Sequence, residues 1–168
     1  YVQAPAMRRN QSTVALEIGP FELIEARTLF EGEAAALAAT LITDEELAGL
    51  SAALDAMEEE DRLNIIGEIA DREFHVRIAR ATRNSAVVYV VESLWDARSS
   101  SPLVARMLEK VRDAGVRPRI DEHRAVFRAL QARDPVAARA AMREHLNRVI
   151  DDLLRATEIE ELEATRAR

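Results

Sequence analysis

The three histidines of this 168-residue chain are the residues to which chemistry is most readily assigned. His75 lies four residues after Asp71, so in a helix the two side chains lie on one face. His123 and His145 each lie among apolar residues at helical spacing, which indicates that they also point inward. A carboxylate that points inward is costly unless it is paired or binds a metal ion. Asp71 with three imidazoles is a ligand set suited to Zn, and also to Ni, Fe, Co or Mn.

The distances of two histidines from the Asp134-Pro135 step support a shared site. His123 is eleven residues before Asp134, and His145 is eleven residues after it. If the flanking helices form an antiparallel hairpin that turns at Asp134, equal distances bring both histidines to one level. At about 1.5 Å rise per residue, each would lie roughly 16 Å from the turn. The pattern therefore predicts two histidines that are close enough to share an ion.

Two simpler interpretations of these residues remain open. A single inward histidine is more often a core residue, hydrogen-bonded to a carbonyl or a carboxylate, than a metal ligand. Asp71 could also form only an ion pair with one protonated histidine, which would leave the inward position of the other two unexplained. The Asp71–His75 pair alone is a weak signal, and the four residues together favour a metal site.

Composition indicates a helical protein and excludes several kinds of site. Ala and Leu dominate the apolar residues, and Gly and Pro number five each, which favours helices. The chain has no cysteine, which excludes disulfides, thiolate zinc sites and cysteine nucleophiles. The net charge of −7 argues against binding of nucleic acid by these residues alone. No apolar run approaches the ~20 residues of a membrane span, and the N-terminus is not a signal peptide, so we expect a cytoplasmic protein.

Helix start signals and apolar periodicity predict an all-α fold, a compact antiparallel bundle of six or seven helices. Thr43 with Glu46 forms a capping-box pattern, and Asn84 and Asp134 are further N-cap residues. We expect residues 1–16 to be a linker, 17–157 to form the helical domain and 158–168 to fray. The expected helices cover residues 20–41, 43–59, 61–81, 84 through at least 95, 102–113, 118–133, and a last helix from 135.

Several segments, in order along the chain, resemble one known family, the FCD effector domain. This domain is the C-terminal part of FadR-like regulators in the GntR family, and the resemblance covers essentially residues 20–155. The segments that carry it are ELIEARTLFEGEAAALAA (Glu22–Ala39), T-x-E-E-L (Thr43–Leu47), D-R-E-F-H (Asp71–His75), A-T-R-N (Ala81–Asn84), D-E-H-R-A-V (Asp121–Val126) and D-P-V-A-A-R-A-A-M-R-E-H-L (Asp134–Leu146).

The resemblance implies roles for individual residues. The ligands of the family's metal-binding branch correspond to the same aspartate and three histidines. By the same resemblance, Arg27 would face the cavity and pair with a carboxylate of the effector, and Asn84 is a further candidate for the pocket. A winged-helix DNA-binding domain precedes the FCD domain in such regulators. Tyr1-Val2 resembles the end of its last wing strand, so residues 1–16 would be the remnant of that wing and a linker.

We therefore expect the ligand-sensing domain of a bacterial transcriptional regulator. It would bind a divalent metal, Zn before the others, and a small carboxylate effector such as a hydroxy acid, a sugar acid or a dicarboxylate. The effector would favour one arrangement of the helices over another. A homodimer would transmit the change to winged-helix heads that contact operator DNA, because two-fold protein symmetry matches operator half-sites.

Two other functions stay open. A metal-dependent enzyme could use open metal positions to activate water, but no inward glutamate with the spacing of a general base stands out. The two Glu-x-x-His motifs of a di-iron bundle and the adjacent His-Asp pair of HD-type phosphohydrolases are absent. We therefore expect no enzymatic activity. A helical dimerisation module that binds no ligand is the remaining alternative.

Overall fold

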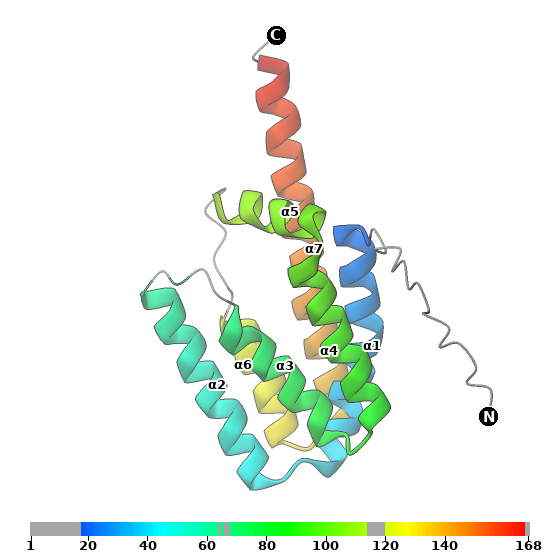
Figure 1. Ribbon diagram of the computed structural model, residues 1–168. Coiled ribbons are helices and arrows are strands. Elements are labelled where there is room, and N and C mark those ends of the chain that lie inside the picture. Colours follow the sequence, from blue (N-terminus) through cyan, green and yellow to red (C-terminus); the bar gives the residue numbers. More distant parts are fainter. Residues whose placement is uncertain (1–17, 64, 66–67, 114–119, 167–168) are drawn as a thin grey trace, which may run out of the picture.

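The computed structural model describes residues 18–63, 65, 68–113 and 120–166. Within these residues the chain forms seven helices and no strand, arranged as one bundle (Figure 1). The predicted all-α fold is confirmed, whereas the predicted linker at residues 1–16 lies outside the described residues. The helices are α1 (Pro20–Leu41), α2 (Asp44–Arg62), α3 (Ile69–Ala81), α4 (Ser85–Ser100), α5 (Pro102–Asp113), α6 (Ile120–Gln131) and α7 (Pro135–Arg166).

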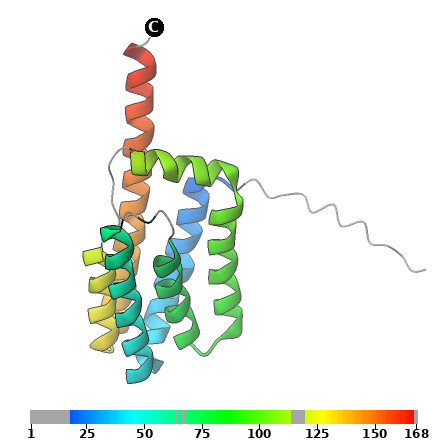
Figure 2. The ribbon, with the colours of Figure 1, turned by 60° about the vertical axis from the view of Figure 1, so that its left-hand side comes forward.

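Helix α1 is central in the bundle. It contacts α3, α4, α5, α6 and α7. Much of its buried face is alanine, and these small side chains allow the neighbouring helices to approach closely. Helix α5 lies across one end of the bundle, and α7 continues past it, away from the other helices (Figure 2). None of the helices in the described part of the chain is apolar over a length that could cross a membrane.

The hydrophobic core has two parts. The larger cluster joins α1, α2, α3, α6 and α7 and includes the fully buried Phe74, Leu130 and Leu146. A smaller cluster lies between α3 and α4 and includes Val91 and Trp95. The two clusters meet at His75, because Phe74 of the larger cluster and Trp95 of the smaller one both pack on its ring.

Local residues set the helix starts, as the sequence predicts. Thr43 and Glu46 form the expected capping box at α2. The side chains of Asn84 and Asp134 each accept backbone N–H groups from the first turn of the next helix. Pro20, Pro102 and Pro135 each occupy the first helical position, where a missing N–H has no consequence.

The predicted third helix was wrong at its start. We expected it over residues 61–81, but α2 runs through Asp61 to Arg62 and α3 begins at Ile69. The sequence between them, L-N-I-I-G-E, contains Asn, Gly and two β-branched residues, which all lower helix propensity. The predicted start of the sixth helix at Pro118 lies outside the described residues. Helix α7 extends to Arg166, through most of the segment that we expected to fray.

Glu46 ties the start of α2 to the turn between α3 and α4. Its carboxylate accepts hydrogen bonds from Nη1 and Nη2 of Arg83, the latter at 2.9 Å. It also accepts one from the backbone N–H of Thr43 at 2.9 Å. The hydrogen bonds from Arg83, followed by those from Thr43, outweigh partial burial and lower the pKa of Glu46 from 4.5 to about 2. The carboxylate is therefore ionised in the folded protein at pH values where it is protonated in the unfolded chain.

We expect Glu46→Gln to lower the free energy of unfolding at pH 7 by roughly 0.5–1 kcal/mol, because the amide keeps the capping shape but loses the ion pair. Since the folded-state pKa is lowered, this contribution is present above pH 4.5 and is lost as the pH falls toward 2. Urea unfolding of both proteins at pH 7, 4.5 and 3.5 measures the difference. A difference that stays constant over this range would contradict the assignment, and Glu45→Gln, an exposed charge in the same turn, is the control.

Candidate metal centre

Four side chains from three helices meet inside the bundle. Asp71 and His75 lie one turn apart on α3, His123 lies in the first turn of α6, and His145 lies on α7. Each offers one nitrogen or oxygen atom, and these four atoms all lie within 4.8 Å of one another. The three histidines are buried, and the Asp71 side chain is 24% exposed. The structure therefore brings together all four residues that the sequence predicts as ligands.

The Asp71 carboxylate lies between two of the imidazoles. Its Oδ1 atom is 3.0 Å from His123 Nε2 and 3.3 Å from His75 Nε2. The ring centroids of His123 and His145 are 4.2 Å apart. The ring centroid of His75 lies 5.5 Å from that of His123 and 5.4 Å from that of His145. The close approach of the two histidines on α6 and α7 confirms that equal distances from the Asp134 turn place them at one level.

The donor atoms fit a divalent metal ion. Zn lies about 2.0–2.2 Å from nitrogen and oxygen ligands, so the ligand atoms of one ion are roughly 3–4 Å apart. A spread of up to 4.8 Å closes to such a shell with side-chain shifts of about 1 Å. His75 Nε2, moreover, is buried without a hydrogen-bond partner among the described residues. A buried polar atom of this kind needs a partner, which an ion at this position would supply.

Two glutamates hold the outer nitrogens of two of these histidines. Glu31 of α1, which is fully buried, contacts His75 Nδ1, and Glu122 of α6 lies 3.1 Å from His145 Nδ1. Metal-binding histidines generally donate their second N–H to a carboxylate or a carbonyl, which fixes the ring orientation. Both contacts leave Nε2 as the free nitrogen of the ring. The two glutamates thus occupy the positions of groups that orient metal-binding histidines.

No inward glutamate with the spacing of a general base stands out in the sequence, and Glu31, which the structure places against His75, is not among the predicted site residues. The sequence does contain a signal for Glu31: it lies four residues after Arg27 and four before Ala35, and all three fall on the buried face of α1. Glu122 precedes His123 directly and gives no comparable signal. Its contact with His145 depends on how α6 packs against α7.

The two carboxylates nearest the histidines are ionised. Burial by itself raises the pKa of Asp71, but the hydrogen bond from His123 and the close contact with His75 hold that pKa well below its usual range. Burial acts in the same way on Glu31, where the charges of Arg27 and His75 outweigh it and lower the pKa to about 2. The centre therefore contains two negative charges that need nearby positive groups.

The histidines differ in protonation. Burial, together with the neighbouring His123 and His75, lowers the pKa of His145 well below its ordinary value, so this ring is neutral. Burial also lowers the pKa of His75, but Glu31 and Asp71 outweigh it and the net shift is upward. The raised pKa means that Glu31 and Asp71 favour a positive charge on His75. A divalent cation bound to His75 would supply this charge in place of the proton, because imidazole coordinates metals in its neutral form.

Arg27 lies beside the four residues, deep in the bundle. Its side chain is 2% exposed, its Nε donates to Glu31 Oε1 at 2.6 Å, and its guanidinium carbon lies 4.1 Å from the centre of the Trp95 ring. Its Nη2 has no hydrogen-bond partner in the part of the chain that the structure describes. The inward position agrees with what the family resemblance implies, and the contact of Arg27 with an effector stays a prediction.

Asn84 is exposed and lies in the turn between α3 and α4. Its side-chain oxygen accepts the backbone N–H groups of Ala86, at 3.0 Å, and Val87, at 3.4 Å, and so caps α4. The structure does not bring this side chain to the four ligands or to Arg27. A role for Asn84 in the pocket stays a prediction that its position does not support.

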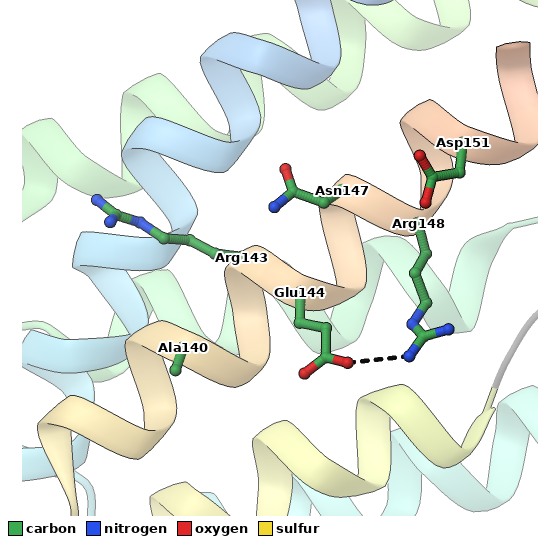
Figure 3. A pocket seen from close by; sticks show the side chains of 6 residues that line it. All are labelled: Ala140, Arg143, Glu144, Asn147, Arg148 and Asp151. Atoms are coloured by element: carbon green, nitrogen blue, oxygen red, sulfur yellow. Dashed lines mark hydrogen bonds and ion pairs between the residues drawn. The ribbon is translucent and has the colours of Figure 1, made fainter.

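An open pocket on the surface of α7 is a separate feature (Figure 3). None of the four ligands lines it. Arg148 on its edge donates to Glu144 at 2.9 Å and also lies 3.1 Å from Glu122, the partner of His145. The residues that line it are Ala140, Arg143, Glu144, Asn147, Arg148 and Asp151.

Comparison with known protein sequences gives a family and related regulators. The model of the FCD domain matches residues 22–148. The Exu regulon transcriptional regulator of Escherichia coli K12 is 36% identical over 128 residues, which cover 76% of this chain and 49% of that protein. The Uxu operon transcriptional regulator of the same strain is 32% identical over 154 residues, or 90% of this chain and 60% of that protein. The chain thus spans about half the length of the curated relatives it matches.

Comparison with solved structures agrees. Streptococcus agalactiae GntR is similar with a TM-score of 0.61 and 26% identity, over 76% of this chain and 56% of that one. E. coli McbR/YncC has the same fold, with a TM-score of 0.70 and 24% identity over 82% and 66% of the two chains. The named relatives are transcriptional regulators and not enzymes, in agreement with the sequence-based expectation. Since the FCD model matches most of the chain, the protein belongs to the FCD domain family found in GntR-type regulators.

Proposed function

We propose that this chain is the ligand-sensing domain of a GntR-type transcriptional regulator, which binds a divalent metal and, beside it, a small organic acid. The observation that carries the proposal is the buried group of Asp71, His75, His123 and His145, with an unpartnered N–H of Arg27 next to it. Operator DNA would be contacted by a winged-helix domain that is not among these residues. Such a regulator would act in the cytoplasm.

The donor set favours Zn as the ion. Three imidazoles and one carboxylate match its preference for nitrogen and oxygen in a tetrahedral shell. Ni, Fe, Co or Mn would use the same four side chains and keep open positions for further oxygen ligands. When bound, the ion would supply positive charge and coordination positions to the oxygens of the acid. The residues of the chain would orient that acid and exclude water.

The charges around the centre support an anionic effector. Asp71 offsets one of the two charges of a divalent ion, and the Arg27–Glu31 pair at 2.6 Å is internally neutral. Glu122 is likewise paired with Arg148, at 3.1 Å. One positive charge then remains uncompensated in a buried place, where an isolated charge is costly. A carboxylate would neutralise it, and the free Nη2 of Arg27 would give that carboxylate a charge-assisted hydrogen bond.

The position of Arg27 supports transmission through α1. The metal ligands lie on α3, α6 and α7, whereas Arg27 lies on α1, whose start directly follows the residues expected to lead to the DNA-binding domain. An acid held by both the ion and Arg27 would therefore connect α1 to the rest of the bundle. A homodimer of such domains would place two DNA-binding heads at the spacing of operator half-sites.

We expect metal-free protein to bind one equivalent of Zn. Free Zn at a hundred times its Kd should raise the melting temperature of the protein by about 5–10 °C. His145→Ala should weaken Zn binding by more than about 100-fold, because it removes a ligand and not only a supporting group. Isothermal titration and metal analysis measure both. Protein without stoichiometric metal, and with a melting temperature unaltered by Zn or Ni, would support a dimerisation module without ligand instead.

We expect Glu31→Gln to weaken Zn binding by about 10–100-fold, because the amide holds His75 less firmly and removes a negative charge from its ring. Glu33→Gln is the matched control, since Glu33 lies on the same helix but is half exposed and pairs with Arg139. Titration with a competing chelator compares the affinities. Equal Zn affinity of Glu31→Gln and the unaltered protein would show that Glu31 does not support the site.

Thermal-shift screening of small organic acids against the metal-loaded protein tests the effector. At least one acid should stabilise it, and Arg27→Ala should weaken that acid's binding by about 10-fold or more, the usual effect of losing a charged hydrogen bond. Arg27→Lys, which keeps the charge, covers the case in which the alanine variant does not fold, and the exposed Arg62→Ala is the control. Acid binding that is unchanged in both Arg27 variants would remove Arg27 from the pocket.

A further inference from the structure

Asp71 differs from the other three candidate ligands in how it is held. The side chains of the three histidines are at most 8% exposed, whereas that of Asp71 is 24% exposed. An aspartate side chain is short, so its carboxylate follows the backbone, and Asp71 is the third residue of α3. The position of this ligand therefore depends on how firmly the first turn of α3 is held.

The start of α3 lacks a cap from its own residues. Glu68 is in the N-cap position, where Ser, Thr, Asp or Asn is preferred. Its side chain makes no capping hydrogen bond to α3 within the part of the chain that the structure describes. Helix ends open at little cost in free energy unless side chains or neighbouring elements hold them. Contacts from other helices must therefore hold this turn.

Two such contacts are present. Glu60 of α2 accepts the backbone N–H of Ala70 at 3.2 Å. Arg98 of α4 binds the carboxylate of Glu68 with two nitrogens: Nε donates at 2.7 Å, and Nη2 donates to the other oxygen. The two helices are antiparallel and joined by a short turn, so the end of α4 lies beside the start of α3 (Figure 1). A bidentate pair of this kind fixes orientation as well as distance.

Arg98 is itself held in place. Its side chain is 8% exposed, and its guanidinium carbon lies 5.2 Å from the centre of the buried Trp95 ring. Burial by itself lowers the pKa of Arg98, but Glu68, and after it the charge of Asp71, raise the pKa above its ordinary value. The guanidinium therefore lies close enough to the candidate metal centre for Asp71 to act on it.

We propose that Arg98 is a positioning residue of the metal centre: by holding Glu68 it fixes the first turn of α3 and, through that turn, the carboxylate of Asp71. Arg98 then supports metal binding through the geometry of one ligand and against the effect of its own charge, which repels a cation. This inference rests on the proposed function, since it assumes that the four residues bind a metal ion.

Arg98→Met tests the sign of the effect, because geometry and charge predict opposite results. Methionine is flexible and suits a buried place, and Glu68, whose side chain is 34% exposed, can be hydrated without its partner. We expect Zn binding to weaken by about 10-fold in isothermal titration, the lower end of the effect of groups that orient metal ligands. A charge effect alone would strengthen it, since a positive group is removed from the surroundings of a cation. Zn affinity that is unchanged or higher in Arg98→Met would overturn the inference.

Combination with Asp71→Ala shows through which ligand Arg98 acts. Three histidines remain to bind Zn in that variant, and Arg98→Met should not weaken binding further, because the ligand that Arg98 positions is gone. In a His145→Ala background, which keeps Asp71, the loss of about 10-fold should persist. If Arg98→Met weakens Zn binding as much without Asp71 as with it, Arg98 supports the structure in general and the inference is wrong.

Glu68→Gln is the second variant, for the case in which Arg98→Met does not fold. The amide keeps the size of the side chain but loses the ion pair, so Zn binding should again fall by about 10-fold, and by much less in the Asp71→Ala background. Glu92→Gln is the matched control: Glu92 is also 34% exposed and pairs with an arginine between α3 and α4, Arg80, at 3.0 Å. An equal loss in Glu68→Gln and Glu92→Gln would contradict the proposal.

The outcomes separate the inference from the proposed function. If the unaltered protein binds Zn, and the Arg98 and Glu68 variants bind it equally well, Asp71 is positioned without them, and the inference is wrong while the metal site stands. If the unaltered protein binds neither Zn nor Ni, Fe, Co or Mn, the proposed function fails and the inference fails with it.

Discussion

Ionised carboxylates inside the bundle are the constraint on which the rest of the structure depends. A buried charge is stable only when groups of opposite charge and hydrogen-bond donors surround it. Asp71 has two imidazoles, and Glu31 has Arg27 and His75. Since these partners come from α1, α3 and α6, the charges hold the helices in one arrangement, and a helix that moved would leave a charge without its partner. The apolar core alone does not impose that condition.

The features that could be predicted from the sequence are those that depend on residues close together in the chain. A helix starts where a side chain such as that of Thr43, Asn84 or Asp134 can cap it, and a capping contact spans only two or three residues. The convergence of Asp71, His75, His123 and His145 could be predicted for a related reason. One pair lies a helical turn apart, and the other two histidines are related by a hairpin, so simple geometry places them without knowledge of the whole fold.

What could not be predicted depends on packing between distant segments. Glu31 meets His75 across 44 positions of the chain, and Trp95 meets Arg27 only because α4 packs against α1. Asn84 shows the opposite case: the family resemblance suggests a pocket residue, but the same amide caps α4. Its side-chain oxygen already accepts two backbone N–H groups, and a role of Asn84 in the pocket stays a prediction.

The distribution of these groups over the helices suggests why this site suits a sensor. The four candidate ligands lie on α3, α6 and α7, and the donors that have no partner among the described residues, Arg27 and Trp95, lie on α1 and α4. A ligand can shift an equilibrium between arrangements only by binding one of them more tightly. Under the proposed function, an acid held by both the ion and Arg27 would do so, because its affinity would depend on how α1 lies relative to the candidate ligands. Helix α1 contacts five of the six other helices, so the arrangement selected at the site extends through most of the bundle.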